Sequence, residues 1–437
     1  MGGTPRQIAP LFQRLPHGPS GLSRETVARN QRIRMYGGMI ESVHRQGYPA
    51  TTVADVIGLA GVSRRAFYEQ FSNKEDCFLA TYDIVVARAR KQMVDAWQAE
   101  RGFPNRLRSA FGALLEHIGS DPKGARLVLV DSLGIGPRGG DRMRLSGLGF
   151  ELMLGQVLRL APEPLSLPPL LTRAIVGGVR HVAFTAVVEG HERELAALRG
   201  DLLDVIDAYS SPAGARLAPV LAGAGAPARA GGHPFLERPA ARAQMLSALL
   251  RLTLAQGYEG LTDAQIAAMA GASTEAFHSE FPSKESCFVA LLDEVVREAM
   301  CRTGAGFREG AEWPEAVHRG MGAFLEYLLA NPDLAQLAFV ELFEIGPAAV
   351  GRAGAMVGAL TSLLCRGAPP PRHGRAIAQQ AIAGALWAVL CAAVGERRTQ
   401  RLPSLVDQLS FLVLAPHVGP SAAVEAIGSC RTQRHAA

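Results

Sequence analysis

Two arginines, a tyrosine and a lysine lie close together near the start of the chain, as Arg64, Arg65, Tyr68 and Lys74. These side chains suit nucleic-acid binding, because a guanidinium can form paired hydrogen bonds to a guanine edge or a phosphate, and tyrosine and lysine bind phosphate oxygens. Ser63 precedes the pair and offers a hydroxyl. Arginine pairs on exposed helices usually do no more than face solvent, so the surrounding elements must decide between the two interpretations.

Other chemical patterns are weak. The six cysteines form no Cys-x-x-Cys pair and the eleven histidines show no zinc-ligand spacing, so we expect no metal site and no disulfide framework. The letters GIGPRG at 134–139 fit a dinucleotide-binding pattern, but no strand precedes them, which favours a loop between helices. No Gly-x-Ser-x-Gly elbow occurs. We therefore expect neither an enzyme nor a bound cofactor.

The sequence around the two arginines predicts two short helices joined by a glycine turn. A longer helix ends near Gly47, Thr51 or Thr52 caps the segment VADVIGLA, and Gly61 breaks it. Ser63 then caps the segment RRAFYEQF. Two helices that cross steeply in this way place the second where it can enter the major groove of DNA.

Helical patterns extend through the rest of the chain. Apolar residues recur at spacings of three and four, and β-branched alternation between tight turns is absent. A chain of 437 residues with 48% hydrophobic content can bury more than one core. The sequence therefore predicts an all-α protein of several domains.

The second half of the chain repeats the first. Adding 210 to a position gives its counterpart, so that GVSRRAFYEQFSNKEDCF at 61–78 corresponds to GASTEAFHSEFPSKESCF at 271–288. After the proline-rich breaks APEPLSLPP and GAPPPRHG the offset falls to 207, which aligns Ala174 with Ala381. The expected organisation is an N-terminal extension (1–29), head 1 (30–83), body 1 (84–210), a linker (211–238), head 2 (239–293) and body 2 (294–430).

The segment TTVADVIGLAGVSRRAFYEQFSNKEDCFLATYD, from Thr51 to Asp83, resembles the helix-turn-helix region of TetR/AcrR-type transcriptional regulators, and NQRIRMYGGMIESVHRQGYPA resembles their first helix. The resemblance implies two tandem TetR-like units, each a three-helix DNA-binding head followed by a helical body for ligand binding and dimerisation. It implies that Tyr68 and Lys74 bind mainly phosphates. The DNA-contacting residues that it implies are Thr52, Ser63, Arg64, Arg65, Tyr68 and Lys74.

Head 2 keeps the scaffold residues but loses the basic face. Thr274 and Glu275 stand where head 1 has Arg64 and Arg65, and Glu280 adds a second carboxylate. Carboxylates oppose an interaction that depends on neutralising phosphates. We therefore expect head 2 to be a structural relic or a protein-binding surface rather than a reader of DNA sequence.

Two-fold dimers of the family imply that the two units form an intramolecular pseudo-dimer, built from the late helices of both bodies, and a further homodimer stays open. The resemblance also implies a small apolar effector in a body, although most of the large apolar side chains there would be core in any bundle. The candidates in body 1 are Phe111, Leu114, Leu115, Phe150, Met153 and Phe184.

The expected location is the cytoplasm, in association with the nucleoid. The start of the chain has no apolar signal-peptide core, and the cysteine pattern fits a reducing compartment. The segment 376–395 approaches membrane-spanning length, but Gln379 and Gln380 favour a buried helix, so we expect no membrane partner.

The expected function is that of a DNA-binding transcriptional regulator, a repressor, whose partner is a double-stranded operator. A net charge of +5 permits this function without requiring it. The alternative is a helical interaction or ligand-binding protein that has lost operator binding, an interpretation that the acidic second head favours.

Overall fold

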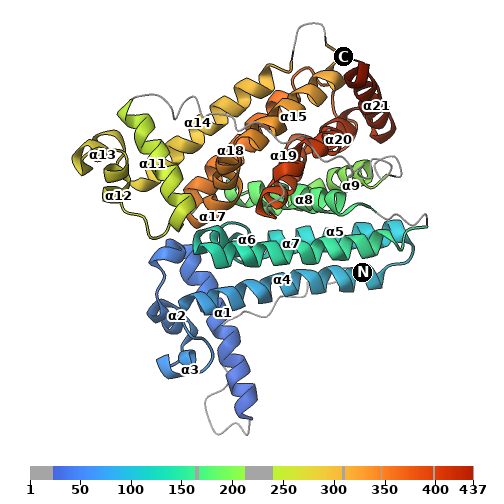
Figure 1. Ribbon diagram of the computed structural model, residues 1–437. Helices are drawn as coiled ribbons and strands as arrows, with labels where there is room; N and C mark the ends of the chain where they lie inside the picture. Colours follow the sequence, from blue (N-terminus) through green and yellow to red (C-terminus); the bar gives the residue numbers. More distant parts are fainter. Residues whose placement is uncertain are drawn as a thin grey trace.

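The computed structural model describes residues 23–162, 167–211, 240–307, 311–345, 347–396 and 399–436, and every regular element within these ranges is helical (Figure 1). This confirms the all-α expectation. Most of the expected N-terminal extension and of the expected linker lies outside the described residues. The first helix begins at Arg24, upstream of residue 30, where head 1 is expected to begin.

The first unit consists of a head, a long connecting helix and the remainder of a body. The head contains α1 (Arg24–Ala50), α2 (Val53–Ala60) and α3 (Arg64–Tyr68). Helix α4 (Lys74–Ala99) leads from the head into the body. The body continues with α5 (Phe103–Ser120), α6 (Pro122–Leu129), η1 (Asp131–Ile135), α7 (Pro137–Leu158), α8 (Pro169–Glu189), η2 (Glu192–Leu198) and α9 (Arg199–Tyr209).

The second unit repeats this order of helices. Its head contains α11 (Ala241–Gln256), α12 (Asp263–Met269) and α13 (Thr274–Glu280), and α14 (Lys284–Gly304) leads into the body. The body continues with α15 (Trp313–Ala330), α16 (Pro332–Gln336), η3 (Leu337–Glu341), α17 (Leu342–Ile345), α18 (Pro347–Leu364), α19 (Ala378–Gly395), η4 (Thr399–Leu405), α20 (Val406–Val418) and α21 (Pro420–Ala436).

Polar caps begin the head helices at the same repeat positions in both units. Thr52 begins α2 and Thr262 begins α12, each in a reciprocal capping box with the residue three positions on. Ser63 and Ser273 begin α3 and α13, because each hydroxyl oxygen accepts a hydrogen bond from the amide three positions on. Gly61 joins α2 to α3 at a φ of 60°, a conformation that favours glycine. The duplicated sequence therefore forms a duplicated local structure.

Helices α8 and α19 cross in the interior, and glycines allow them to approach closely. A Cβ atom on Gly177 of α8 would lie 2.7 Å from the carbonyl oxygen of Gly384 on α19, so neither position has room for a side chain. Nearby, the Tyr209 hydroxyl of α9 donates to the Leu412 carbonyl oxygen of α20 at 2.7 Å. The late helices of body 1 are therefore packed against the late helices of body 2.

The same two helices, α8 and α19, are long and apolar enough to cross a membrane by length and composition alone. In this structure 50% of the most apolar stretch of α8 and 61% of that of α19 are buried inside the protein. At least half of each stretch is thus buried inside the protein, and a buried helix is the expectation for the segment 376–395.

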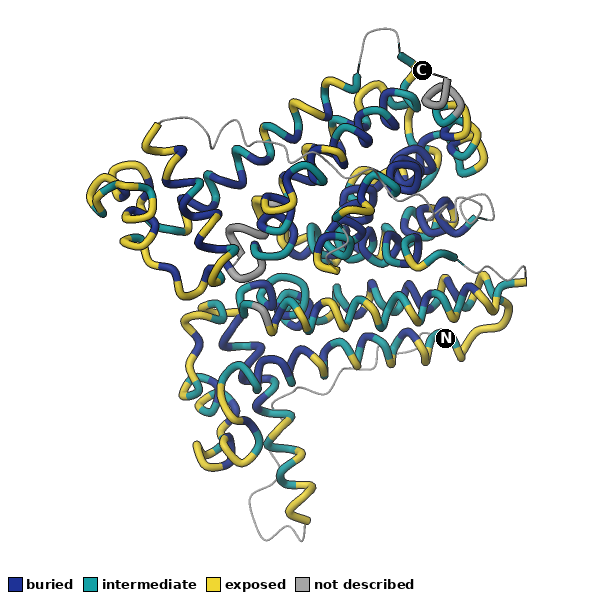
Figure 2. Tube along the Cα trace, viewed as in Figure 1, coloured by how far each residue is buried: buried dark blue, intermediate teal, exposed yellow. Residues whose placement is uncertain are grey.

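Both heads lie on the same side of the molecule (Figure 1). Helices α1–α3 lie at the lower left and α11–α13 at the upper left of that view, with the bodies extending to the right. Buried residues run through the bodies, whereas the ends of both heads are exposed (Figure 2). The heads therefore project from a common helical core.

Candidate nucleic-acid interface

Helix α3 is anchored by one face and exposes the other. Ala66 and Phe67 are buried, and the Phe67 ring lies 5.5 Å from that of Phe71. Arg64 and Tyr68 are exposed, with 51% of Tyr68 accessible to solvent. Among the described residues, Arg64 has no hydrogen-bond or ion-pair partner. The helix therefore presents a guanidinium and a phenol to solvent from a fixed base.

The exposed Arg65 forms only a surface ion pair. Its Nε atom lies 2.8 Å from Oε1 of Glu69 one turn later, and the two side chains are 89% and 58% exposed. Such a pair contributes little in water and is weakened by salt. The guanidinium can therefore exchange this carboxylate for a phosphate or a guanine edge at small cost.

The two hydroxyl candidates begin helices. Thr52 donates its hydroxyl to Oδ2 of Asp55 at 2.7 Å and its amide to the same oxygen at 2.8 Å, and these two bonds lower the pKa of Asp55. The Thr52 hydroxyl oxygen also accepts a hydrogen bond from the Asp55 amide. Ser63 accepts from the Ala66 amide at 3.1 Å, which leaves its own O–H able to donate. Both residues are exposed, and Ser63 is the better placed to donate to a phosphate.

Lys74 lies at the start of α4, where its amine faces protein. The Nζ atom donates to the carbonyl oxygen of Tyr48 at 3.0 Å and lies 4.2 Å from the centre of the Tyr48 ring, and burial lowers the pKa of the amine. In head 2, the Lys284 amine donates to the Tyr258 carbonyl at 3.2 Å in the same way. The contact persists in the acidic head, so we infer that this lysine holds α4 against the turn after the first helix.

Replacing Lys74 by methionine should lower the free energy of unfolding by about 1–2 kcal/mol, because the carbonyl oxygens of Tyr48 and Pro49 lose a charged donor while most of the apolar stem remains. Urea unfolding followed by circular dichroism measures the effect. Lys284→Met is the matched control and should cost a similar amount. Unchanged stability with a large loss of DNA affinity would instead assign Lys74 to phosphate binding.

Further arginines on α1 extend the basic surface, which the sequence analysis did not include. Arg24, Arg29 and Arg32 are exposed on the first turns of this helix, whose end projects beyond α3 in Figure 1. The Arg32 Nε atom donates to Oε1 of Gln70 at 2.8 Å, which ties α1 to the turn after α3. The arginine spacing in RETVARNQRIR was the signal for this surface.

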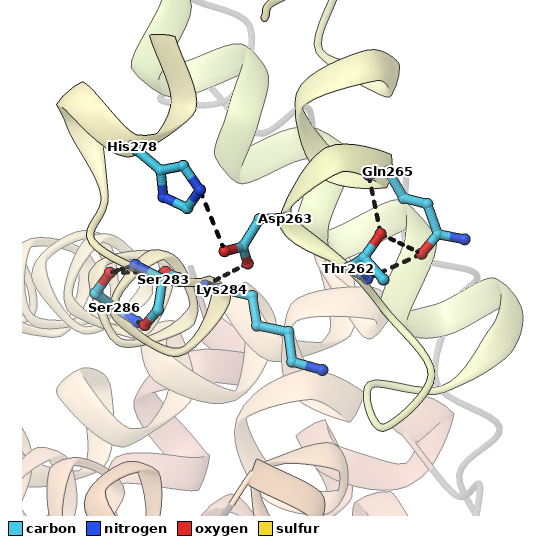
Figure 3. A network of polar contacts seen from close by, with 7 residues as sticks. All are labelled: Thr262, Asp263, Gln265, His278, Ser283, Lys284 and Ser286. Carbon is cyan, nitrogen blue, oxygen red and sulfur yellow. Dashed lines mark hydrogen bonds and ion pairs between the residues drawn. The ribbon is translucent and has the colours of Figure 1, made fainter. Parts of the chain in front are cut away.

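Head 2 has the same scaffold with an acidic surface. Phe277 is fully buried, whereas Glu275 and His278 on the outer face of α13 are exposed. Figure 3 shows His278 pointing towards Asp263, with its Nε2 atom 3.7 Å from Oδ2 of that carboxylate. Hydrogen bonds from its own amide and from Ser273 lower the pKa of Glu275 and keep it charged. This surface would repel phosphates.

Comparisons with known proteins find matches to parts of this chain. A family model described as "Bacterial regulatory proteins, tetR family" matches residues 40–81 and 245–291, one segment in each head. The nucleoid occlusion factor SlmA of Haemophilus influenzae (strain PittGG) is 28% identical over 97 residues, or 22% of this chain and 44% of the relative. SlmA of Pasteurella multocida is 30% identical over 97 residues, or 22% and 49% of the two chains. The matches thus span less than half of these relatives.

Two solved structures are similar to part of the chain at low identity. The fatty acid degradation regulator FadR of Bacillus halodurans has a TM-score of 0.36 and 16% identity, over 40% of this chain and 96% of that one. A putative tetR family transcription regulator from Shewanella has a TM-score of 0.33 and 21% identity, over 39% and 96%. Both family matches fall on the helix-turn-helix regions described above, so the segment typical of tetR-family regulatory proteins occurs twice in this chain, once in each head.

Proposed function

We propose that the chain is a sequence-specific DNA-binding transcriptional regulator, a repressor, that reads its operator through head 1. One observation carries the proposal: α3 buries Ala66 and Phe67 while Arg64, Arg65 and Tyr68 face solvent. A helix held in this way can enter the major groove, where arginine recognises guanine and tyrosine binds the backbone. The hydroxyl of Thr52 and the amine of Lys74 contribute mainly to the scaffold of this surface.

In the proposed assembly the two bodies form a pseudo-dimer within one chain. The close crossing of α8 with α19 and the contact of α9 with α20 support it. Head 2 does not read DNA in this assembly, because its outer face carries carboxylates where head 1 carries arginines. Each chain then has one reading head, so a palindromic operator requires two chains.

Control by a small effector is the second part of the proposal. A cavity of about 260 Å³ lies in body 1, lined by side chains of α4 to α8. Four of the six apolar side chains expected there contribute to it, whereas Leu115 is fully buried core and Phe184 stacks on His181. Helix α4 runs from the head at Lys74 to the cavity wall at Trp97. A ligand that shifts α4 would change the position of head 1.

The location proposed for the chain is the cytoplasm, at the nucleoid. The partial match to proteins described as nucleoid occlusion factors supports an association with chromosomal DNA. The proposed partners are an operator, an effector and a second copy of the chain.

Selection from genomic DNA tests the proposal. Purified protein is incubated with sheared DNA of its own genome at about 150 mM salt, where non-specific attraction is damped, and the retained fragments are sequenced. We expect one enriched motif. An inverted repeat would show two reading heads acting together, and a single asymmetric motif would show one chain on one half-site. No enrichment would contradict the proposal and favour the interaction protein that has lost operator binding.

A further inference from the structure

The cavity in body 1 is apolar except at a few positions. Its wall is built mainly from aliphatic and aromatic side chains of α4, α5, α7 and α8. Tyr82, His117, Ser146 and Arg180 are the exceptions, and no carboxylate occurs among the described residues that line the cavity. A site of this composition suits an apolar ligand that carries a small number of polar atoms.

His117 requires that the ligand be polar somewhere. Only 6% of this residue is exposed, and neither of its ring nitrogens has a hydrogen-bond partner among the described residues. Burial lowers the pKa of His117, so the imidazole is neutral near neutral pH and offers one donor and one acceptor. A pure hydrocarbon would leave both nitrogens unpaired at a cost, whereas an oxygen of the ligand could satisfy one of them.

Arg180 indicates that the polar group of the ligand is negatively charged. It is the only charged side chain among the described residues that line the cavity, and its one recorded polar contact is a distant one, from Nη1 to Sδ of Met143 at 3.7 Å. The half-buried Arg180 has no carboxylate partner among the described residues, so its positive charge is not balanced by a neighbouring negative charge there. It suits an anionic group, which a planar carboxylate can supply through two parallel hydrogen bonds.

The duplicated unit provides an internal comparison. At the offset of 207 the counterpart of Arg180 is Trp387, and at the offset of 210 the counterpart of Leu129 is Phe339. The rings of Trp387 and Phe339 lie 5.4 Å apart, so that an aromatic pair occupies this part of body 2. The cation is therefore a feature of body 1 and is not required by the fold.

Two small residues of the cavity also have larger counterparts in body 2. Gly147 of α7 corresponds to Val357 and Ser146 to Met356, both buried in body 2. A Cβ on Gly147 would meet no atom within 4 Å, so the space beside it is open. Body 1 thus has small side chains at two positions where body 2 has larger, buried side chains.

We propose that body 1 binds one molecule of an apolar monocarboxylate per chain, with the carboxylate on Arg180 and the hydrocarbon tail between α4, α5 and α7. This names the ligand class of the effector site and rests on the proposed function for its regulatory meaning. The cavity of about 260 Å³ has room for a ligand of this kind, and octanoate serves as its probe. Body 2 binds no such ligand.

The position of Arg180 connects the ligand to the crossing of the bodies. The next residue, His181, packs against Gly384 of α19 so closely that a Cβ atom on Gly384 would collide with the His181 side chain. A carboxylate that binds Arg180 therefore pulls on α8, the helix of body 1 that crosses α19 of body 2. We expect octanoate to weaken operator binding through this helix.

Calorimetry with a matched set of ligands tests the ligand class. Octanoate, octan-1-ol and octylamine share a tail and differ in the charge of the polar group. We expect octanoate to bind the full chain at one site, at least tenfold more tightly than octan-1-ol, and octylamine not to bind. Equal affinity for the acid and the alcohol, or tighter binding of the amine, would overturn the assignment.

Three variants locate the site. Arg180→Gln should weaken octanoate binding at least tenfold and leave octan-1-ol unchanged, whereas Arg144→Gln, which removes an exposed cation paired with Asp141, should change neither. Gly147→Val introduces the residue of body 2 into open space and should abolish binding of all tails without unfolding the chain. Unchanged octanoate affinity in Arg180→Gln and Gly147→Val would place the ligand elsewhere and overturn the proposal.

The calorimetric readout needs no DNA, which separates the two proposals. A chain that binds octanoate but enriches no DNA motif contradicts the regulator function and supports the ligand site. A chain that binds an operator but ignores octanoate contradicts only the ligand class.

Discussion

A chain in which Arg64 and Arg65 are both replaced by alanine should bind its operator about 100-fold more weakly, with an unchanged melting temperature. Each arginine that recognises a guanine contributes about 1–3 kcal/mol of discrimination, so two such contacts contribute about 2–6 kcal/mol, a range that includes the 2.7 kcal/mol or so that a 100-fold change requires. Both side chains are exposed, and among the described residues Arg65 pairs with the exposed Glu69 alone, so their removal leaves the core intact. Fluorescence anisotropy on the selected operator measures the affinity.

A charge-matched variant controls for non-specific attraction. Arg101 and Arg108 are exposed arginines in the body, and their replacement by alanine removes the same charge. This control should weaken binding only slightly. If the Arg64 and Arg65 variant retained full affinity for the operator, α3 would not be the reading helix.

Gly384→Val should destabilise the protein by about 3 kcal/mol or more. A side chain at this position on α19 would collide with His181 and would lie 2.5 Å from the carbonyl oxygen of Gly177. Backbone on the opposite helix cannot move aside without opening the crossing of α8 and α19, and overpacking of this kind costs about 1–3 kcal/mol even in cores that can relax. Urea unfolding and the melting temperature both report the effect.

Gly200→Ala provides the matched control, because a Cβ there meets no atom within 4 Å. This residue lies in α9, and the added methyl should leave stability unchanged or raise it slightly. A Gly384→Val protein as stable as the Gly200→Ala protein would mean that the two bodies do not depend on the close helix crossing.

The sequence predicted those features that local chemistry and periodicity determine. Thr52 and Ser63 begin the helices that their side-chain oxygens can cap, and Gly61 occupies the turn between them. The repeat at the offset of 210 placed a second head around Ser273, where the structure forms the same pair of short helices. Capping and turn conformations depend on a few neighbouring residues, so a single sequence is enough to predict them.

The direction of a side chain, and the contacts between segments far apart in the sequence, could not be predicted in this way. The charge of Lys74 and the family resemblance both suggest phosphate binding, which stays a prediction, but neither indicates that the Lys74 amine lies over the Tyr48 ring. In the sequence, Gly177 and Gly384 are glycines inside apolar helices, where they lower helix stability. Only the close crossing of α8 and α19 explains why these positions lack a side chain. The place of Arg180 beside Met143 depends likewise on how α7 and α8 pack. Each of these contacts joins segments that lie far apart in the chain.

The crossing of α8 and α19 also has a consequence for dosage. Two bodies in one chain meet at an effective concentration of about millimolar, whatever the number of molecules in the cell. A pair assembled from separate chains would instead come apart on dilution. Because the two heads are encoded by different parts of one gene, each can change separately. Head 2 has Thr274 and Glu275 where head 1 has two arginines. The two heads of one chain can therefore differ in sequence and in DNA binding, whereas the two heads of a homodimer must be identical.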